Sequence, residues 1–239
     1  MPDEIYECVT KTAILRYYRE IWDGFFDDVG NHNLGIVFVY GKNAIFARND
    51  KSTGLPYRIG SFGDLERIVN RHGIEIVPDL ETIDEPGKTR TGVIDVDSYT
   101  SVERTKKLVR VVYNRLRILG HDAYIVSTGS RAGFHVRYDI CEPAPFAVVK
   151  RYLLENVIRY IWSNVDGAED LMLDPERLSY PVSHKRESNK CFLDLASLKD
   201  RGGVKAVGTI NAKNGALVRV VDPRRLASFK PTPWEICEF

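Results

Sequence analysis

Two carboxylates, Asp95 and Asp97, are separated by one valine at the end of the apolar run 92–97. Alternate residues of a β-strand point to the same face, so the sequence predicts that these carboxylates lie side by side. Paired carboxylates suit Mg²⁺ or Mn²⁺, and a third would allow the site to hold two ions. An Asp-x-Asp pair is also an ordinary feature of strand ends. The apolar surroundings favour the metal interpretation, because a carboxylate there is costly without a cation.

A second polar segment, Ser-Thr-Gly-Ser-Arg-Ala-Gly-Phe-His, spans residues 127–135 between two β-rich runs. Its glycines free backbone N–H groups, and its hydroxyls and arginine add donors and positive charge. Such a set can form a nest for a phosphate. A plain hairpin followed by a buried strand histidine explains the same residues, so both interpretations stay open here. The candidate ligand contacts are Gly129, Ser130, Arg131 and His135.

The third segment begins at Asp194 and continues through residues 205–217. It supplies a further carboxylate and several groups that can contact an anion. Asn214-Gly215 is a strong short turn signal and predicts a hairpin turn at residues 213–215. The candidate binding residues of this segment are Lys205, Thr209, Asn211 and Lys213.

The elements that would position these residues follow a recognisable order. Strands are expected at 92–97, 123–127, 134–140 and 191–195, and helices at 100–120 and 145–165. This is the β-α-β-β-α-β order of ferredoxin-like and RNA-recognition-type sheets, which expose one face. Its first and third strands are central neighbours, which would bring Asp95, Asp97 and His135 together. Asp194, on the fourth strand, is expected to need the sheet twist to come close.

Residues 1–88 predict a smaller α/β lobe. A helix is expected at 13–26, a hairpin from strands 34–40 and 44–48, and a second helix at 61–72. The polar, turn-rich stretch 84–88 is the best boundary. We therefore expect one α+β domain over residues 1–239, with sub-lobes 1–88 and 89–239.

The charge distribution is uneven, although 34 Lys and Arg residues nearly balance 33 Asp and Glu residues. Residues 1–94 contain 11 basic and 15 acidic side chains, and residues 95–239 contain 23 and 18. A polyanion would therefore contact the second part, unless the surplus is a solvated surface. The expected nucleic-acid contacts are Lys106, Lys107, Arg110 and Arg117 on the helix after Asp97, and Lys185, Arg186 and Lys190 in the loop before Asp194.

Composition excludes several classes of protein. The chain is 44% hydrophobic and 28% charged, which argues against disorder, collagen and coiled-coil arrays. Its four cysteines include no Cys-x-x-Cys pair, so no zinc site is expected. The apolar runs are far shorter than a membrane span. We expect a cytoplasmic protein without a membrane partner.

Taken together, the ordered motifs resemble the archaeo-eukaryotic primase superfamily, most closely its replicative DNA primase small (catalytic) subunit. That family has a strand ending in Asp-x-Asp, a Ser-Gly-x-x-Gly-x-His loop and a third aspartate. It then has a stretch that residues 205–216 match without gaps. Two positions depart from the family: Lys205 replaces an arginine and Asn211 a histidine. The chain also has no zinc knob, so it looks like a trimmed catalytic core.

The resemblance implies a primase-like core, with the small N-terminal lobe packed on an RNA-recognition-like catalytic lobe. It implies template-directed synthesis of short RNA or DNA primers by two-metal phosphoryl transfer. Asp95, Asp97 and Asp194 would hold two Mg²⁺ or Mn²⁺ ions. Residues of the second and third segments would grip an NTP or dNTP, namely Gly129, Ser130, Arg131, His135, Lys205, Thr209, Asn211 and Lys213. Single-stranded DNA would be the template, and a primase large subunit is a conceivable partner.

Three other interpretations stay open. A gap-filling or repair polymerase would use the same residues. A non-catalytic subunit of a primase complex would bind nucleic acid, but it has no need of carboxylates beside phosphates. A metal-dependent nuclease could use the carboxylates, but the glycine–histidine loop suits a triphosphate better than a diester.

Overall fold

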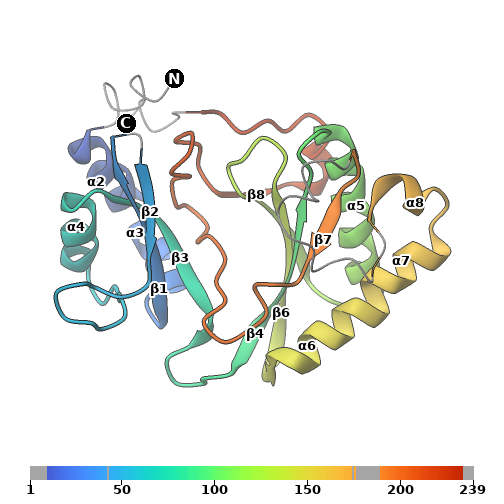
Figure 1. Ribbon diagram of the computed structural model, residues 1–239, viewed down its shortest axis with the longest axis horizontal. Helices are drawn as coiled ribbons and strands as arrows, with labels where there is room; N and C mark the ends of the chain where they lie inside the picture. Colours follow the sequence, from blue (N-terminus) through green and yellow to red (C-terminus); the bar gives the residue numbers. More distant parts are fainter. Residues whose placement is uncertain (1–9, 42, 174, 176–188, 234–239) are drawn as a thin grey trace.

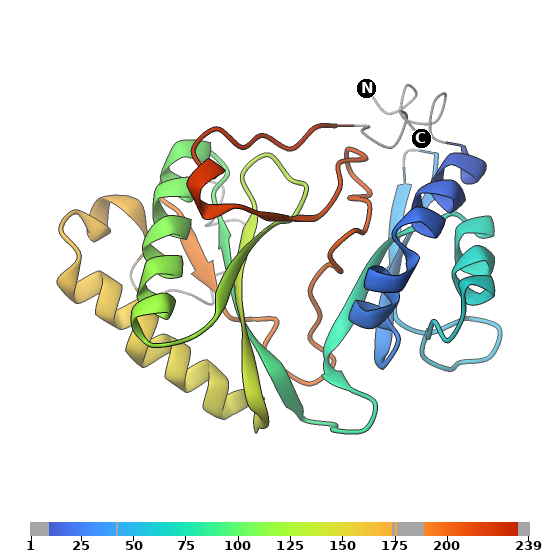
Figure 2. The same cartoon turned by 180° about the vertical axis from the view of Figure 1, so that it is seen from behind.

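Two antiparallel sheets face each other in the protein, each covered on its outer side by helices (Figure 1). The computed structural model describes residues 10–41, 43–173, 175 and 189–233. A three-stranded sheet has the order β2-β1-β3, and a five-stranded sheet has the order β7-β4-β6-β5-β8. We call these halves the N-terminal and C-terminal lobes. The segment 195–218, which we call the return segment, runs between them (Figures 1 and 2).

Within the described residues, the N-terminal lobe places three helices against its sheet. One predicted helix, 13–26, is in fact two, because the first ends at Ile21. The strand from residue 73 to residue 82 was not predicted. The predicted hairpin and the helix at 61–72 are confirmed, the latter capped by Ser61. The elements are α2 (Lys11–Glu20), α3 (Trp22–Val29), β1 (His32–Tyr40), β2 (Asn43–Ala47), α4 (Phe62–Asn70) and β3 (Gly73–Thr82).

The C-terminal lobe has the predicted β-α-β-β-α-β order, and a short fifth strand is added at one edge. The long helix expected at 145–165 contains one π-helical turn between two α-helical parts. The elements are β4 (Lys88–Asp97), α5 (Val102–Ile118), β5 (Ala123–Ser127), β6 (Phe134–Pro145), α6 (Phe146–Leu153), η1 (Leu154–Ile158), α7 (Arg159–Asn164), α8 (Ala168–Leu171), β7 (Phe192–Asp194), β8 (Arg219–Val221) and η3 (Pro223–Arg225).

The strand register corrects one expectation. β7 pairs directly with β4, and Asp194 lies opposite Asp95. On the other side of β4, His135 of β6 is also opposite Asp95. Residues opposite each other in an antiparallel pair point to the same face. Asp194 therefore reaches the face of Asp95 through direct pairing, and the sheet twist is not needed for this.

The two faces of the five-stranded sheet have different neighbours. Ile94 and Val96 point away from the carboxylates, and they pack with Phe134 and Val136 against α5 and α6. The helices therefore cover only the apolar face of this sheet. The other face of the sheet, which carries no helices, is turned towards the N-terminal lobe (Figure 2). Asp95 lies on that face, because it alternates with Ile94 and Val96 along β4.

The chain returns from the C-terminal lobe to complete the N-terminal lobe. Backbone hydrogen bonds join residues 202–206 to β3, including Val204 N to Pro78 O (3.2 Å) and Ala206 N to Ile76 O (3.0 Å). Ile210 and Leu217 are buried in the N-terminal core. A segment that follows β7 of the C-terminal lobe thus forms part of the N-terminal lobe and ties the two lobes together.

No helix in the described part of the chain combines the length and the apolar character that a bilayer span requires.

Thr209 lies within the N-terminal core and tests how the return segment contributes to stability. Its Oγ1 accepts from Ile76 N (2.7 Å) and contacts Tyr18 Oη (3.2 Å). Thr209→Val would leave a buried N–H without an acceptor, so we expect the free energy of unfolding to fall by about 1–3 kcal/mol. Thr12→Val, on the exposed side of α2, should change it by less than about 0.5 kcal/mol. Equal values from chemical denaturation of the two variants would contradict this account.

Candidate active site

A row of three polar side chains crosses the open face of the five-stranded sheet. Asp194, Asp95 and His135 are consecutive cross-strand partners on β7, β4 and β6. Asp97 lies two residues beyond Asp95 on the same face of β4. The His135 Nε2 atom is 3.8 Å from Asp95 Oδ1. The structure thus brings the predicted carboxylates and the predicted histidine together.

Both lobes line the cavity above this row. The cavity has a volume of about 280 Å³ and is bordered by Asp95, Asp194 and His135. Arg48 enters from the end of β2, while Ser197 and Lys199 come from the return segment. Carboxylates therefore line one wall and cationic groups the other, which is an arrangement suited to an anionic ligand bound through cations.

Arg48 was not identified from the sequence. Its Nη1 atom is paired with Oδ1 of Asp79, a carboxylate with no exposed side-chain surface. Arg201 contacts the other oxygen of Asp79, at 3.5 Å. A buried carboxylate held by two guanidinium groups fixes them both. The only sequence signal was a basic residue at the end of the predicted strand 44–48, and the partner strand β3 was not predicted.

His135 is almost fully buried at the base of the cavity. Burial lowers the pKa of His135 well below its usual value, and the positive charges of Arg137 and Lys205 lower it further. The imidazole is therefore neutral at physiological pH. A neutral ring presents one donor nitrogen and one acceptor nitrogen, so it acts here as a hydrogen-bonding group.

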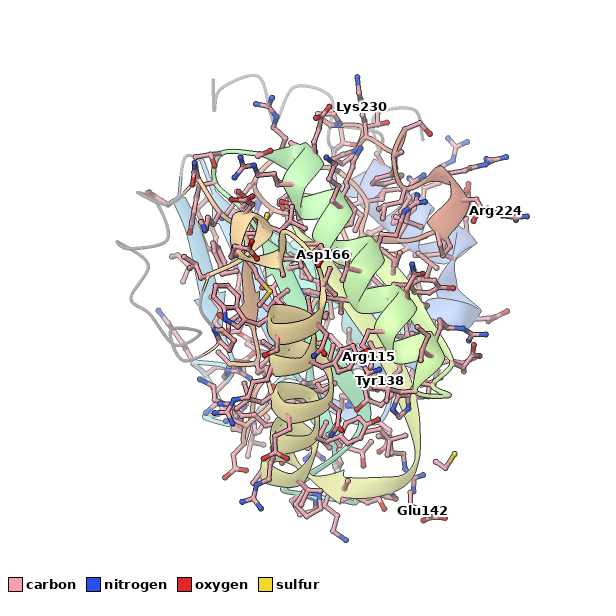
Figure 3. The ribbon with its side chains drawn as sticks, turned by 90° about the vertical axis from the view of Figure 1, so that its right-hand side faces the viewer. Arg115, Tyr138, Glu142, Asp166, Arg224 and Lys230 are labelled. Carbon is pink, nitrogen blue, oxygen red and sulfur yellow. The ribbon has the colours of Figure 1, made fainter. Side chains whose placement is uncertain are left out.

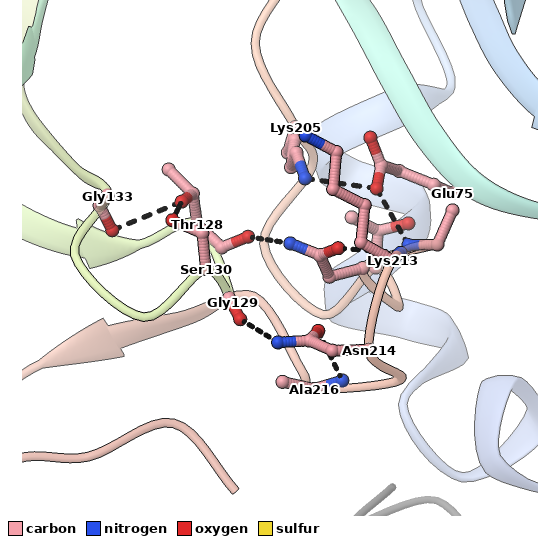
Figure 4. A network of polar contacts seen from close by, with 12 residues as sticks. Glu75, Thr128, Gly129, Ser130, Gly133, Lys205, Lys213, Asn214 and Ala216 are labelled. Carbon is pink, nitrogen blue, oxygen red and sulfur yellow. Dashed lines mark hydrogen bonds and ion pairs between the residues drawn. The ribbon is translucent and has the colours of Figure 1, made fainter. Parts of the chain in front are cut away.

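Lys205 reaches the same region from the return segment. Its Nζ atom donates to Glu75 Oε2 (3.0 Å), and the same oxygen accepts from Ala212 N (2.9 Å). Glu75 belongs to β3 and is buried. This pair fastens the return segment to the N-terminal sheet (Figure 4). It also keeps the Lys205 charge near His135.

The predicted phosphate loop, residues 128–133, is held from two sides. Thr128 Oγ1 contacts Ser130 Oγ (3.0 Å) and donates to Gly133 O (3.1 Å). Asn211 Nδ2 donates to Thr128 O, and Asn214 Nδ2 donates to Gly129 O, both at 2.8 Å (Figure 4).

Gly129 has a positive φ of 75°, and a Cβ there would lie 2.8 Å from Asn211 Cβ, so this position requires glycine. Asn211 holds the loop through this close packing and through its hydrogen bond to Thr128 O. Ser130 and Arg131 lie on the more exposed side of the loop.

One of two further predicted nucleotide contacts, Thr209, has another placement, and the other, Lys213, lies at the surface. Thr209 is fully buried in the N-terminal core, where its hydroxyl serves β3 and Tyr18. This corrects its expected role, because no ligand can reach a hydroxyl enclosed in the core. Lys213 is exposed at the turn beside Asn211, which accepts from its backbone N–H (2.9 Å).

The helix α5, which carries four of the predicted nucleic-acid contacts, covers the face of the sheet opposite the carboxylates (Figure 3). Lys106 Nζ donates to the carbonyls of Ala227 (2.9 Å) and Phe229 (2.6 Å). Arg110 donates to Pro223 O (3.1 Å), and Arg117 pairs with Asp122. Burial and the charge of Lys230 lower the pKa of Lys106. Lys107 is exposed, and Lys185 and Arg186 lie outside the described residues.

The carboxylates fit a divalent cation by their chemistry and their backbone placement. Within the described ranges, no three acidic, histidine or cysteine side chains converge closely enough to form a ready metal cluster. Asp97 Oδ1 accepts from Ser98 N (2.8 Å), and Asp194 Oδ1 accepts from Ala196 N (2.6 Å). Asp95 and Asp194 are nevertheless directly opposed, and like charges in such a pair repel. Hard oxygen donors on one face suit Mg²⁺ or Mn²⁺.

Comparison with known proteins agrees with this architecture. No protein-family model and no curated protein matches the chain. Among solved structures, it is similar to the polymerase domain of ligase D from Mycobacterium tuberculosis, determined in complex with DNA. The TM-score is 0.77 at 15% identity, and the alignment covers 99% of this chain and 91% of that chain. The predicted α+β fold class is confirmed: the chain has the fold of that polymerase domain.

Proposed function

We propose that the protein is a template-directed nucleotidyltransferase. The observation that carries this proposal is the row Asp194–Asp95–His135, which lines a cavity that Arg48 also borders, with Asp97 next on the same face of β4. Polymerisation of nucleotides requires a place for cations beside a place for a triphosphate. The carboxylates supply the first, and the basic and hydrogen-bonding groups opposite them supply the second.

Asp95, Asp97 and Asp194 would hold two divalent ions. Bound there, such ions lower the pKa of an attacking 3′-hydroxyl and neutralise the triphosphate and the pyrophosphate that leaves. In the reaction the 3′-oxygen forms a bond to the α-phosphorus and loses its proton. The bond from that phosphorus to the bridging oxygen breaks, releasing pyrophosphate.

The remaining groups of the site position the nucleotide. Arg48 carries positive charge on the cavity wall opposite the carboxylates. Lys205, paired with Glu75, places a second positive charge near His135. His135 offers a hydrogen bond from the cavity base. Ser130 and Arg131 belong to the loop that precedes β6 and would add a hydroxyl and a positive charge. Positioning and charge neutralisation account for most of phosphoryl-transfer catalysis, so no covalent nucleophile is needed.

Phe46 offers a surface for a base. It lies opposite Val37, which lies opposite Glu75, so all three point to the cleft side of the N-terminal sheet. Its side chain is 49% exposed, and the Arg48 guanidinium is 5.2 Å from its ring centroid. Exposed aromatic rings beside cationic groups stack nucleic-acid bases. Phe46 would hold a template or nucleotide base, while Lys106, Lys107, Arg110 and Arg117 remain proposed contacts for a more distant part of the strand.

Two biological roles are compatible with this chemistry. The motif resemblance favours primer synthesis by a primase small subunit with single-stranded DNA, an NTP or dNTP and a large-subunit partner. The polymerase domain of ligase D, to which the chain is similar, was determined in complex with DNA. This similarity favours primer extension or gap filling as the second candidate.

A synthesis assay separates these roles. Single-stranded template with labelled NTPs or dNTPs and Mg²⁺ or Mn²⁺ should give product with the wild type and none with the Asp95→Ala, Asp97→Ala double variant. Unprimed product indicates a primase, and product only with an added primer indicates a polymerase. No product in either format from folded, metal-loaded protein would contradict the proposal that this chain acts alone.

Metal binding can be measured without activity. We expect saturating Mn²⁺ to raise the wild-type Tm by roughly 5–11 °C, because a ligand at about 100 times its Kd adds ~2.7 kcal/mol. Asp95→Asn should lose most of this shift. Asp166→Asn, on the exposed helical side, should keep it (Figure 3). An equal shift in all three proteins would place the cation elsewhere.

The stacking role of Phe46 has a control on the same strand. Ile45 is 46% exposed but points to the other face of β2. Phe46→Ala should weaken binding of single-stranded DNA roughly tenfold, since one base–aromatic stack contributes about 1–3 kcal/mol. Ile45→Ala should leave the affinity unchanged in a fluorescence anisotropy titration. Equal effects of the two variants would argue against a stacking surface at Phe46.

A further inference from the structure

Arg137 is a buried charged residue that no motif identified. It lies on β6, two residues after His135 and on the same face of the strand, and only 3% of its surface is exposed. Burial lowers the pKa of Arg137. The negative charge of Asp28 is the largest effect that raises this pKa. Its Nε atom is buried without a hydrogen-bond partner in the described part of the chain. Burying a guanidinium group costs desolvation free energy, and here one of its nitrogens also lacks a hydrogen bond. The residue therefore points to a role other than stability.

One nitrogen of this side chain joins two groups of the proposed active site. Arg137 Nη2 is 3.0 Å from His135 Nδ1 and 2.6 Å from the backbone oxygen of Lys205. An Nη2 group carries two hydrogens, so it can donate one to each. The planar guanidinium thereby fixes the distance between the imidazole and the return segment.

The contact also determines which imidazole nitrogen carries the proton. Arginine has donors and no acceptor, so a ring nitrogen that bonds to it must offer a lone pair. Nδ1 is therefore unprotonated, and the proton of the neutral ring is on Nε2. Nε2 is the atom that faces Asp95 and the cavity.

We propose that Arg137 is a positioning residue that holds His135 as the Nε2–H tautomer and fixes it beside Lys205. His135 then donates a hydrogen bond into the cavity, to a phosphate oxygen of the nucleotide. This use of the donor rests on the proposed function, whereas the tautomer itself does not. Without Arg137 the ring could adopt the other tautomer, which presents a lone pair to an anion and repels it.

The tautomer can be read directly from two-bond ¹H–¹⁵N correlation spectra of the imidazole groups. The protein has five histidines, and the His135 signals are identified by their loss in His135→Gln. His32 supplies an internal reference, because its Nδ1 is 3.0 Å from the carbonyl oxygen of Glu81 and must be protonated there. His135 should show the opposite pattern, with a protonated Nε2 and an unprotonated Nδ1.

Arg137→Met removes the donor and should change the His135 pattern to a mixture of tautomers or to protonated Nδ1. Arg137→Gln, whose side chain is too short to reach Nδ1, gives the same test if the methionine variant does not fold. Arg159→Met, an exposed residue on α7, is the matched control and should leave the spectrum unchanged. A protonated Nδ1 in the wild type would overturn the proposal. A pattern retained in a folded Arg137 variant would also overturn it.

A binding titration with ATP and Mg²⁺ provides the functional readout. Arg137→Met should weaken ATP binding about tenfold, as expected for a hydrogen bond to a charged group, and Arg159→Met should not. Unchanged affinity in Arg137→Met would contradict the positioning role. If the wild type binds no ATP but shows the expected tautomer and its loss in the variant, the proposed function fails and the assignment to Arg137 stands.

Discussion

The register of β4 between β6 and β7 is the constraint on which the active site depends. Backbone hydrogen bonds set Asp95 opposite both His135 and Asp194, and so place all three on one face. A slip of one residue in either pairing would turn that strand's polar group into the helix-covered core. The apolar residues Ile94 and Val96 oppose such a slip, because they would lose their burial against α5 and α6. The core packing thus specifies the position of the carboxylates.

The opposite wall of the cleft depends on a second device. Two buried carboxylates on β3, Glu75 and Asp79, hold Lys205 and Arg48 in place. Neither acidic group needs to contact a ligand, and each keeps a long basic side chain from moving freely. The return segment supplies Lys205 and is hydrogen-bonded to the same strand. The return segment therefore connects the two walls of the cleft, although the walls belong to different sheets.

The sequence predicted the features that depend on local pattern. The strand at 123–127, the helix after Asp97 and the order of the C-terminal lobe were correct, because hydrophobic periodicity and turn residues specify them. Asp95, Asp97 and His135 were placed together for the same reason. The direct pairing of Asp194 with Asp95 was not predicted, because the twist of the sheet was expected to bring Asp194 close.

Other features depended on contacts between residues distant in sequence. β3 went unpredicted, and with it the partners of Lys205 and Arg48. Thr209 matched a motif position, but its hydroxyl serves the N-terminal core. Arg137 had no motif, and its role emerges only from its contacts with His135 and Lys205.

The central claim is that the carboxylate row binds divalent ions that engage a nucleotide triphosphate. The most direct test is a crystal structure with Mn²⁺ and a non-hydrolysable nucleotide analogue, using anomalous scattering to locate the metal. We expect Mn²⁺ within coordination distance of Asp95 and Asp97, with Asp194 adjoining and the triphosphate between the metal and Lys205. Mn²⁺ and nucleotide bound away from these carboxylates would contradict the account.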